Sequence, residues 1–313
     1  MEQQQLNNQN ASAVWMVRPA LFGFNAETAA SNSFQHDLNT EIQALALAEF
    51  DRVVEVLRSK AIDVFITQST DALAPDAIFP NNWFSTHSNG LLVLYPMMAL
   101  NRRRERISEL LAEVGRRFSI HQTVDLSYFE TADRFLEGTG SIVFDHEYKI
   151  AYAVLSPRTD AVVLNELCNL VGYTPFLFHS FDSTGAPVYH TNVVMHIGKE
   201  YAVICADSIP DPAERAGVME LLSKCGKEVI SISQDQMENF CGNMLQLKNA
   251  AGKLFTICSG TAYNSFTEMQ RKQIEKFSEL LVVDIPIIER VGGGGVRCML
   301  AEIFLPPIAA SIQ

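Results

Sequence analysis

The sequence repeats one unit of secondary structure about every fifty residues, and this period limits the fold more than any other feature. Each unit reads as a hairpin of two apolar strands, a helix and a third strand, and the first strand opens with one small polar residue. Successive openings lie 59, 51, 51 and 55 residues apart, and they are Asn82, Ser141, Asn192, Asn243 and Cys298. Such a period is typical of modules that stack or are arranged around an axis.

The two ends of the chain fit a closed arrangement of these modules. Residues 13–19, 40–58 and 63–67 read as a strand, a helix and a strand that lack the first strand of a hairpin, and residues 298–305 read as one further strand. A ring in which this last strand completes the first module would leave no exposed sheet edge. We therefore predict an α/β fold of five β-β-α-β modules around a pseudo-fivefold axis.

Composition and charge narrow the class of protein. The chain has 313 residues, 48% of them apolar, so residues 13–313 can form a single domain. Residues 1–12 are predicted to be a flexible N-terminal tail, because they are polar and lack the pattern of a signal peptide. The net charge of −12 argues against a nucleic-acid partner. No apolar run reaches the roughly 18 residues of a membrane helix, so we expect a cytoplasmic protein without a membrane partner.

The six cysteines contain no C-x-x-C pair and lie among apolar residues, which favours reduced thiols. Cys298 differs from the others because four glycines, Gly292 to Gly295, lead to it and because it takes an opening position. A glycine run is kept where the backbone needs positive φ or where another group approaches closely. Cys298 is therefore the candidate nucleophile. A cysteine on an apolar strand is also commonly a small core residue, and Cys241 is a rival thiol.

A nucleophilic thiol needs a base, and His190 is the candidate. It lies two residues before Asn192, so on an extended strand both side chains face the same way. His87 and His146 fall in hairpin turns and are expected to be exposed. Glu137, four residues before Ser141, could hold a planar nitrogen group or act as a base. Each residue alone has a structural interpretation, as a satisfied core histidine or a loop acid.

No cofactor and no metal are predicted. The glycine run leads into a strand and matches neither a phosphate-binding loop nor a dinucleotide-binding loop. No spacing of histidines typical of a metal site occurs.

The sequence resembles the guanidino-group-modifying superfamily, also called penteins, which includes arginine deiminases, dimethylarginine dimethylaminohydrolases and glycine amidinotransferases. Within it the chain is most similar to the citrulline-utilisation hydrolase group, often labelled amidinotransferase. The resemblance covers essentially the whole chain. The matching motifs are Phe79-Pro-Asn-Asn82, Glu137-Gly-Thr-Gly140, Ser156-Pro-Arg-Thr159, His190-Thr-Asn192 and Gly294-Gly-Val-Arg-Cys-Met299.

The resemblance implies a five-bladed α/β propeller and a covalent mechanism. Cys298 would attack the central carbon of a guanidinium or ureido group, and His190 would protonate the leaving amine and then activate water. Glu137 would hold the substrate nitrogens and orient His190. Arg158 would grip the carboxylate of an amino-acid substrate.

Two positions depart from the arginine deiminases, which carry aspartates where this chain has Asn82 and Asn192. Asparagine both donates and accepts hydrogen bonds, which suits a neutral ureido group such as that of citrulline. We therefore expect a hydrolase whose small-molecule substrate is a guanidino or ureido amino acid, either citrulline or an arginine-like one. The alternatives are an amidinotransferase that passes the group to an amine, and a non-catalytic propeller such as the ribosome anti-association factors. The sequence leaves a homo-oligomer open.

Overall fold

The computed structural model describes residues 8–38 and 42–308, whose strands form five sheets of three strands each. In each sheet the central strand pairs antiparallel with one neighbour and parallel with the other. The strands are β1 (Ala13–Arg18), β2 (Asp63–Gln68), β3 (Phe84–Thr86), β4 (Leu91–Leu94), β5 (Gln122–Asp125), β6 (Ile142–Asp145), β7 (Ile150–Val154), β8 (Thr174–Phe178), β9 (Met195–Ile197), β10 (Tyr201–Ile204), β11 (Glu228–Ser231), β12 (Leu245–Lys248), β13 (Leu254–Ser259), β14 (Glu279–Val283) and β15 (Ala301–Ile303).

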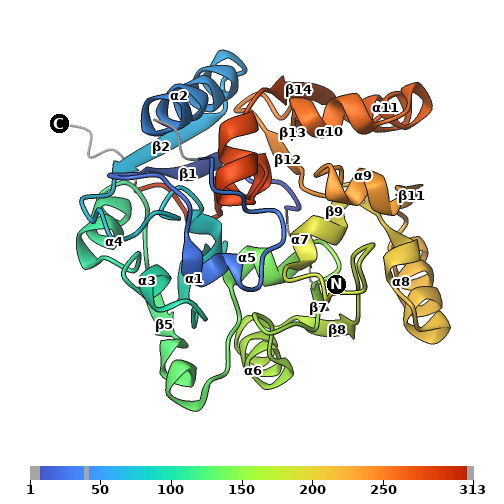
Figure 1. Ribbon diagram of the computed structural model, residues 1–313, viewed down its shortest axis with the longest axis horizontal. Coiled ribbons are helices and arrows are strands. Elements are labelled where there is room, and N and C mark those ends of the chain that lie inside the picture. Colours follow the sequence, from blue (N-terminus) through green and yellow to red (C-terminus); the bar gives the residue numbers. More distant parts are fainter. Residues whose placement is uncertain (1–7, 39–41, 309–313) are drawn as a thin grey trace, which may run out of the picture.

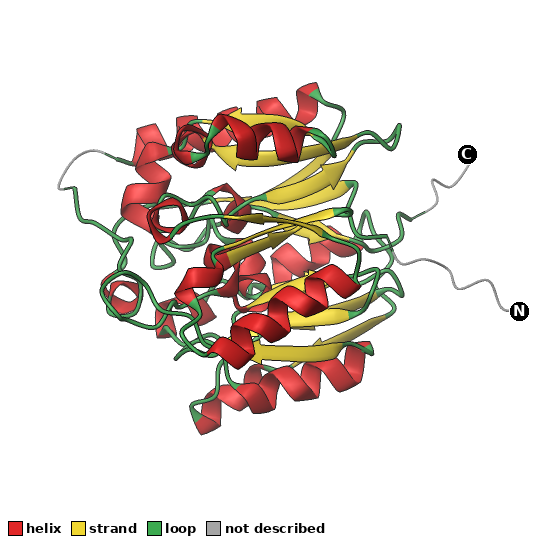
Figure 2. Cartoon of the chain, turned by 90° about the vertical axis from the view of Figure 1, so that its right-hand side faces the viewer, coloured by secondary structure: helices red, strands yellow, loops and turns green. Residues whose placement is uncertain are grey.

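The long helices lie around the outside of the view in Figure 1, and the short helices α5 and α7 lie nearer its middle. Figure 2 shows the same arrangement from the side, with helices on the outer faces of the sheets. The α-helices are α1 (Ala26–Ala29), α2 (Gln43–Ser59), α3 (Leu100–Arg103), α4 (Ser108–Gly115), α5 (Gly138–Ser141), α6 (Ala161–Val171), α7 (Thr191–Val194), α8 (Pro212–Lys224), α9 (Gln234–Glu238), α10 (Gly260–Ser265) and α11 (Glu268–Glu275). Short 3₁₀ turns are η1 (Pro80–Asn82), η2 (Ser127–Ala132), η3 (Ala206–Ser208) and η5 (Val296–Met299), and η4 (Ile288–Gly292) is a π-helix.

The sheets confirm the predicted repeat of hairpin, helix and strand. The hairpins β3–β4, β6–β7, β9–β10 and β12–β13 are antiparallel, and each is followed by a strand parallel to its second member. The last strand, β15, joins the first sheet, because Ala13 pairs antiparallel with Ile303 and parallel with Asp63. The two ends of the chain therefore complete one module, as the sequence predicts.

Two helices begin at capping residues that can be recognised in the sequence. The Asp211 side chain accepts hydrogen bonds from the amides of Ala213 and Glu214 at the start of α8, with Pro212 in the first turn. Thr267 and Gln270 form a reciprocal capping box at the start of α11. These caps end the loops that lead from the sheets to the outer helices.

The opening residues do not begin strands, which corrects the sequence prediction. Asn82 ends η1, Ser141 ends α5, Asn192 lies in α7 and Cys298 lies in η5. Each short turn precedes the first strand of its module, and strand pairing starts one to three residues later. Residues 102–117 also read in the sequence as one helix, whereas the structure divides this stretch between α3 and α4.

Residues 8–12 belong to the predicted flexible tail, yet several of them are buried, and residues 1–7 of that tail lie outside the described residues. Gln9 is buried and donates a hydrogen bond to the carbonyl of Phe144 (3.0 Å), while its Oε1 accepts from the amide of His146 (2.7 Å). Asn10 donates to the carbonyl of Gln246 (2.9 Å). Side-chain amides can satisfy both donors and acceptors at strand ends, so these polar residues tie neighbouring sheets together.

All six cysteines are free and buried, which confirms the prediction of reduced thiols. Among the described residues, none of the helices is both long and apolar enough to span a bilayer.

A buried ion pair links two neighbouring sheets. Lys227, just before β11, places its ammonium 3.2 Å from the carboxylate of Asp145 at the end of β6, and both side chains are fully enclosed. The ammonium also donates to the carbonyls of Gly198 (3.2 Å) and Lys199 (2.9 Å) in the β9–β10 turn. Such a charge is tolerated inside a protein only because it is paired and hydrogen-bonded.

We therefore predict that Lys227→Met destabilises the protein by about 3–5 kcal/mol, because it leaves the Asp145 carboxylate buried without its cationic partner. Urea unfolding curves of wild type and variant measure the difference. The matched control is Lys224→Met, which removes an exposed lysine paired with Glu220 and should change stability little. Equal losses in the two variants would contradict this interpretation of the pair.

Candidate active site

A small cavity of about 20 Å³ lies where η1, α7 and η5 meet. Cys298, His190, Asn82 and Arg158 line it, together with Gly292 to Gly294. Four of the six residues selected from the sequence therefore reach one cavity, and Glu137 and Asn192 contact two of them directly. Because η1, α5, α7 and η5 occupy equivalent places before the first strands of their sheets, the repeat itself brings together residues more than 200 positions apart.

Cys298 is buried, and two amide groups point at its sulfur. Asn243 Nδ2 lies 3.4 Å and Asn192 Nδ2 lies 3.5 Å from Sγ. Burial raises the pKa of the Cys298 thiol, while Asn243, Arg297 and Asn192 act in the opposite direction and only partly offset it. Burial therefore favours the neutral thiol, and the two amide N–H groups are placed to donate hydrogen bonds to the sulfur.

The glycine run lets the backbone lie close to neighbouring side chains, as the sequence indicates. Gly293 has a φ of +64°, which disfavours residues with a side chain. A Cβ atom on Gly294 would lie 3.0 Å from the Phe79 ring and 3.3 Å from Cys298 Cβ. The glycines therefore let the backbone pass directly beside the thiol.

His190 and Glu137 form a buried hydrogen-bonded pair. His190 Nε2 lies 2.9 Å from Glu137 Oε2, and the Glu137 side chain is completely enclosed. Burial lowers the pKa of His190 to about 4, although Glu137 acts to raise it. Burial alone would raise the pKa of Glu137, but Arg158, His190 and Arg102 outweigh it and hold that pKa well below its usual range. The neutral imidazole of His190 is thus held by the Glu137 carboxylate through Nε2, and its Nδ1 is available to other partners.

Arg158 lines the cavity, but its guanidinium already has protein partners. It lies 3.4 Å from Glu137 Oε2 and donates to the carbonyl of Thr28 (2.8 Å) and the hydroxyl of Ser31 (2.7 Å). The ring of Tyr189 lies 5.0 Å below it. The predicted grip on a substrate carboxylate stays a prediction, and it would require Arg158 to exchange some of these partners.

The two asparagines each present one unused polar atom. Asn82 Oδ1 accepts a hydrogen bond from Arg102 Nη1 (2.7 Å), and its Nδ2 has no partner in the described residues. Asn192 uses its Nδ2 toward Cys298, and its Oδ1 has no partner among the same residues. Buried polar atoms are rarely left unpaired, so this donor and this acceptor mark places where a ligand can bind.

Sequence reasoning missed a buried charge cluster in the wall of the cavity. Arg102 pairs with Glu105 at 2.9 Å and lies 4.0 Å from Asp76, and all three side chains are buried. In the sequence Arg102 is the first of three consecutive arginines that head a helical stretch beside acidic residues. The spacing of Arg102 and Glu105, three residues apart at the start of the expected helix, was the one available signal for an ion pair.

Residues 25–36 cover the cavity, which the sequence also did not indicate. Asn32 Nδ2 donates to the carbonyl of Gly293 (3.2 Å), and Gln35 Nε2 donates to the carbonyl of Gly292 (3.0 Å). Both residues line the cavity together with Thr28. The contacts join positions about 260 apart, so no local pattern reveals them.

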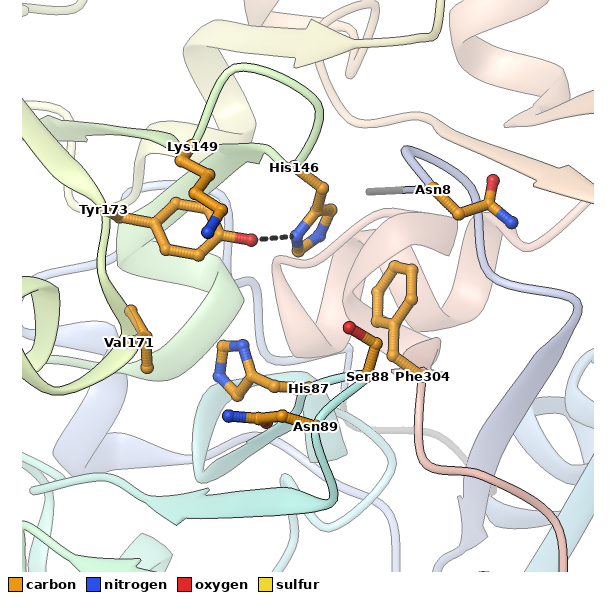
Figure 3. A pocket seen from close by; sticks show the side chains of 9 residues that line it. All are labelled: Asn8, His87, Ser88, Asn89, His146, Lys149, Val171, Tyr173 and Phe304. Atoms are coloured by element: carbon orange, nitrogen blue, oxygen red, sulfur yellow. Dashed lines mark hydrogen bonds between the residues drawn. The ribbon is translucent and has the colours of Figure 1, made fainter. Parts of the chain in front are cut away.

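A second cavity, of about 140 Å³, lies among the hairpin turns, at the other end of the strands from Cys298. Figure 3 shows His87 and His146 among the side chains that line it, with His146 Nδ1 hydrogen-bonded to the Tyr173 hydroxyl at 2.8 Å. Both histidines are buried, so their predicted exposure is wrong. Burial lowers the pKa of each, to about 4 for His87 and about 3 for His146. The packed rings of Phe144, Tyr173 and Phe304 account for this burial.

In the part of the chain that the structure describes, no cluster of His, Cys, Asp and Glu side chains could hold a metal ion.

Comparisons with solved structures show the fold. One of these structures is the N-terminal domain of ArgZ, an arginine dihydrolase of the ornithine-ammonia cycle in cyanobacteria, solved with substrate bound. It matches this chain with a TM-score of 0.74 and 13% sequence identity, over 94% of this chain and 98% of that domain. The chain spans 42% of full-length ArgZ. The enzyme DDAH from Pseudomonas aeruginosa, solved with citrulline, matches with a TM-score of 0.66 and 16% identity, over 94% of this chain and all of the other.

Curated proteins gave no match. A family model described as N,N-dimethylarginine dimethylhydrolase, eukaryotic, matches residues 18–305, which is most of the chain. The protein therefore belongs to the eukaryotic-type N,N-dimethylarginine dimethylhydrolase family, within the guanidino-group-modifying pentein superfamily that its motifs resemble.

Proposed function

We propose that the protein hydrolyses the guanidino or ureido group of an amino acid through a covalent intermediate on Cys298, with His190 as general acid and base. The observation that carries this proposal is that Cys298 and His190 line one cavity while Glu137 holds His190 from behind. A thiol, an imidazole and an orienting carboxylate are the components of nucleophilic catalysis. Family membership supports a guanidino-type substrate and favours hydrolysis over transfer to an amine.

The proposed reaction has two halves. The Cys298 thiol gives its proton to His190, the sulfur bonds to the central carbon of the substrate, and the terminal C–N bond breaks as the amine leaves with that proton. Water then attacks the same carbon and gives a proton to His190, and the C–S bond breaks to restore the thiol. A guanidino substrate yields a ureido product by this route, and a ureido substrate yields a carbamate that loses carbon dioxide.

Asn82 and Asn192 favour a ureido group as the substrate. Arg102 fixes the orientation of the Asn82 amide, so Asn82 offers an N–H donor, and a ureido oxygen needs such a donor. The free Asn192 Oδ1 offers an acceptor for an N–H group of the substrate. ArgZ acts on arginine, and DDAH was solved with citrulline, which supports this range of substrates. Arg158 is the proposed partner of the substrate carboxylate, and Glu137 of its nitrogens.

We also propose that residues 13–313 form one domain and that the five sheets close into a five-bladed α/β propeller. Pairing of β15 with β1 supports closure, because it joins the two ends of the chain in one sheet.

The proposal is tested by measuring ammonia release from citrulline and arginine, and dimethylamine release from N,N-dimethylarginine, under the same conditions. We expect citrulline to be the best of the three. A wide margin in favour of arginine or its dimethyl form would overturn the choice of a ureido substrate, and no release from any substrate would overturn the hydrolase itself.

Asn82→Asp should lower kcat/KM for citrulline by roughly 10- to 100-fold, because a carboxylate cannot donate to the ureido oxygen. The same variant should lower kcat/KM for arginine less, since a carboxylate suits a cationic guanidinium. Asn165→Asp, on the exposed face of α6, is the matched control and should change neither. Equal losses of kcat/KM for both substrates would show that Asn82 does not donate a hydrogen bond to the ureido oxygen.

Gly140→Ala should abolish activity while the protein stays folded. A Cβ atom at this position would collide with Asn82 Nδ2 and would lie 2.7 Å from His190 Nδ1, so it would displace both side chains. Gly23→Ala is the matched control, because no atom lies within 4 Å of its Cβ position. Assays of activity and of melting temperature separate the two effects; activity within a few-fold of wild type in Gly140→Ala would contradict the site geometry.

A further inference from the structure

An open cavity of about 460 Å³ lies beside the segment that covers the catalytic cavity, and we call it the outer cavity. Its walls include Phe34 and Phe240, whose ring centroids lie 5.2 Å apart, and the polar residues Glu238, Glu289 and Arg290. The volume is well within the range of small-molecule sites. Apolar rings beside charges of both signs suit a ligand with an aliphatic body and charged ends.

Glu289 is the unsatisfied group in this wall. Its side chain is 3% exposed, its Oε2 accepts a hydrogen bond from Thr261 (2.6 Å), and its Oε1 makes none among the described residues. Burial raises the pKa of Glu289 to about 7, the nearby acids Glu49 and Asp284 add to this, and the hydroxyls of Ser259 and Thr261 oppose it. No cation of the described residues pairs with Glu289, so a cationic group in the cavity would supply the missing partner.

Arg290 is the complementary group. It is exposed, and within the described residues its guanidinium forms no ion pair and no hydrogen bond. Arginine binds carboxylates through two parallel N–H groups. Because Glu289 and Arg290 are adjacent and line the same cavity, a ligand that carries a cation at one end and a carboxylate at the other can meet both.

We propose that the outer cavity is a second binding site, for a basic α-amino acid, in which Glu289 faces the side-chain ammonium and Arg290 the carboxylate. Phe34 and Phe240 cover the aliphatic part of the ligand. This site is separate from the catalytic cavity, and it stands whether or not the proposed hydrolysis does.

The two cavities share a wall, so a ligand in one would act on the other. In the segment of residues 32–36, Asn32 and Gln35 line the catalytic cavity, whereas Ser33, Phe34 and His36 line the outer cavity. The amide of His36 donates to the carbonyl of Arg290 (2.7 Å), which ties this segment to the second wall. A ligand that contacts Phe34 and Arg290 would therefore hold the cover of the catalytic cavity in place.

Calorimetric titration of the whole chain with L-lysine and with 1,5-diaminopentane tests the site. Neither compound has a guanidino or ureido group, so the result does not depend on turnover. We expect both to bind wild type. Glu289→Gln should weaken both at least about tenfold, and Arg290→Gln should weaken only lysine by about that factor, because the diamine has no carboxylate. Glu268→Gln, exposed on α11, is the control and should leave both unchanged.

Hydrogen exchange supplies the second readout: lysine should slow exchange of the amides of residues 33–36. The proposal is overturned if wild type shows no saturable binding of lysine, or if binding is the same in Glu289→Gln and Glu268→Gln. If Glu289→Gln does not fold, the exposed Arg290→Gln variant decides, since an equal effect on lysine and on the diamine overturns the proposed orientation. Unchanged exchange would overturn the coupling to the cover.

Discussion

The site depends on the cost of enclosing the Glu137 carboxylate. A fully buried carboxylate is unstable unless it is paired, and here Arg158, His190 and Arg102 keep it ionised. Each partner fixes a different part of the molecule. Arg158 also binds the carbonyl of Thr28 and so anchors the segment over the cavity, while Arg102 orients Asn82. The buried Glu137 carboxylate thereby helps to position His190, the segment over the cavity and the Asn82 amide that is proposed to bind the substrate.

The same enclosure sets the resting protonation of the proposed nucleophile and base. Burial raises the pKa of the Cys298 thiol and lowers the pKa of His190 to about 4, which favours the neutral form of both groups near neutral pH. A neutral imidazole can accept the thiol proton, which a protonated one could not. In this account the Cys298 thiol keeps its proton until a substrate fills the cavity, and the proton then moves to His190. The Asn192 and Asn243 amides stabilise the sulfur as it becomes negatively charged.

The sequence predicted the modules and the closeness of several candidate site residues, because both follow from a repeat. Asn82 and Cys298 hold equivalent positions in their modules and His190 lies two residues before another such position, so the repeat predicted that the three lie close together. Their local geometry could not be predicted, since the openings form short turns instead of strand starts. The role of Arg102 was also hidden, because its partners Asn82 and Asp76 lie 20 and 26 residues away. Burial of His87 and His146 reflects packing of side chains from separate modules, which no local pattern records.

The central claim is that Cys298 bonds covalently to the central carbon of the substrate. Acid-quenching the protein during turnover of citrulline or arginine, followed by mass spectrometry of its peptides, tests this most directly. The account predicts a substrate-derived adduct on the peptide that contains Cys298 and none on it in Cys298→Ser. Turnover with no adduct at any quench time, or an adduct on Cys241 instead, would contradict it.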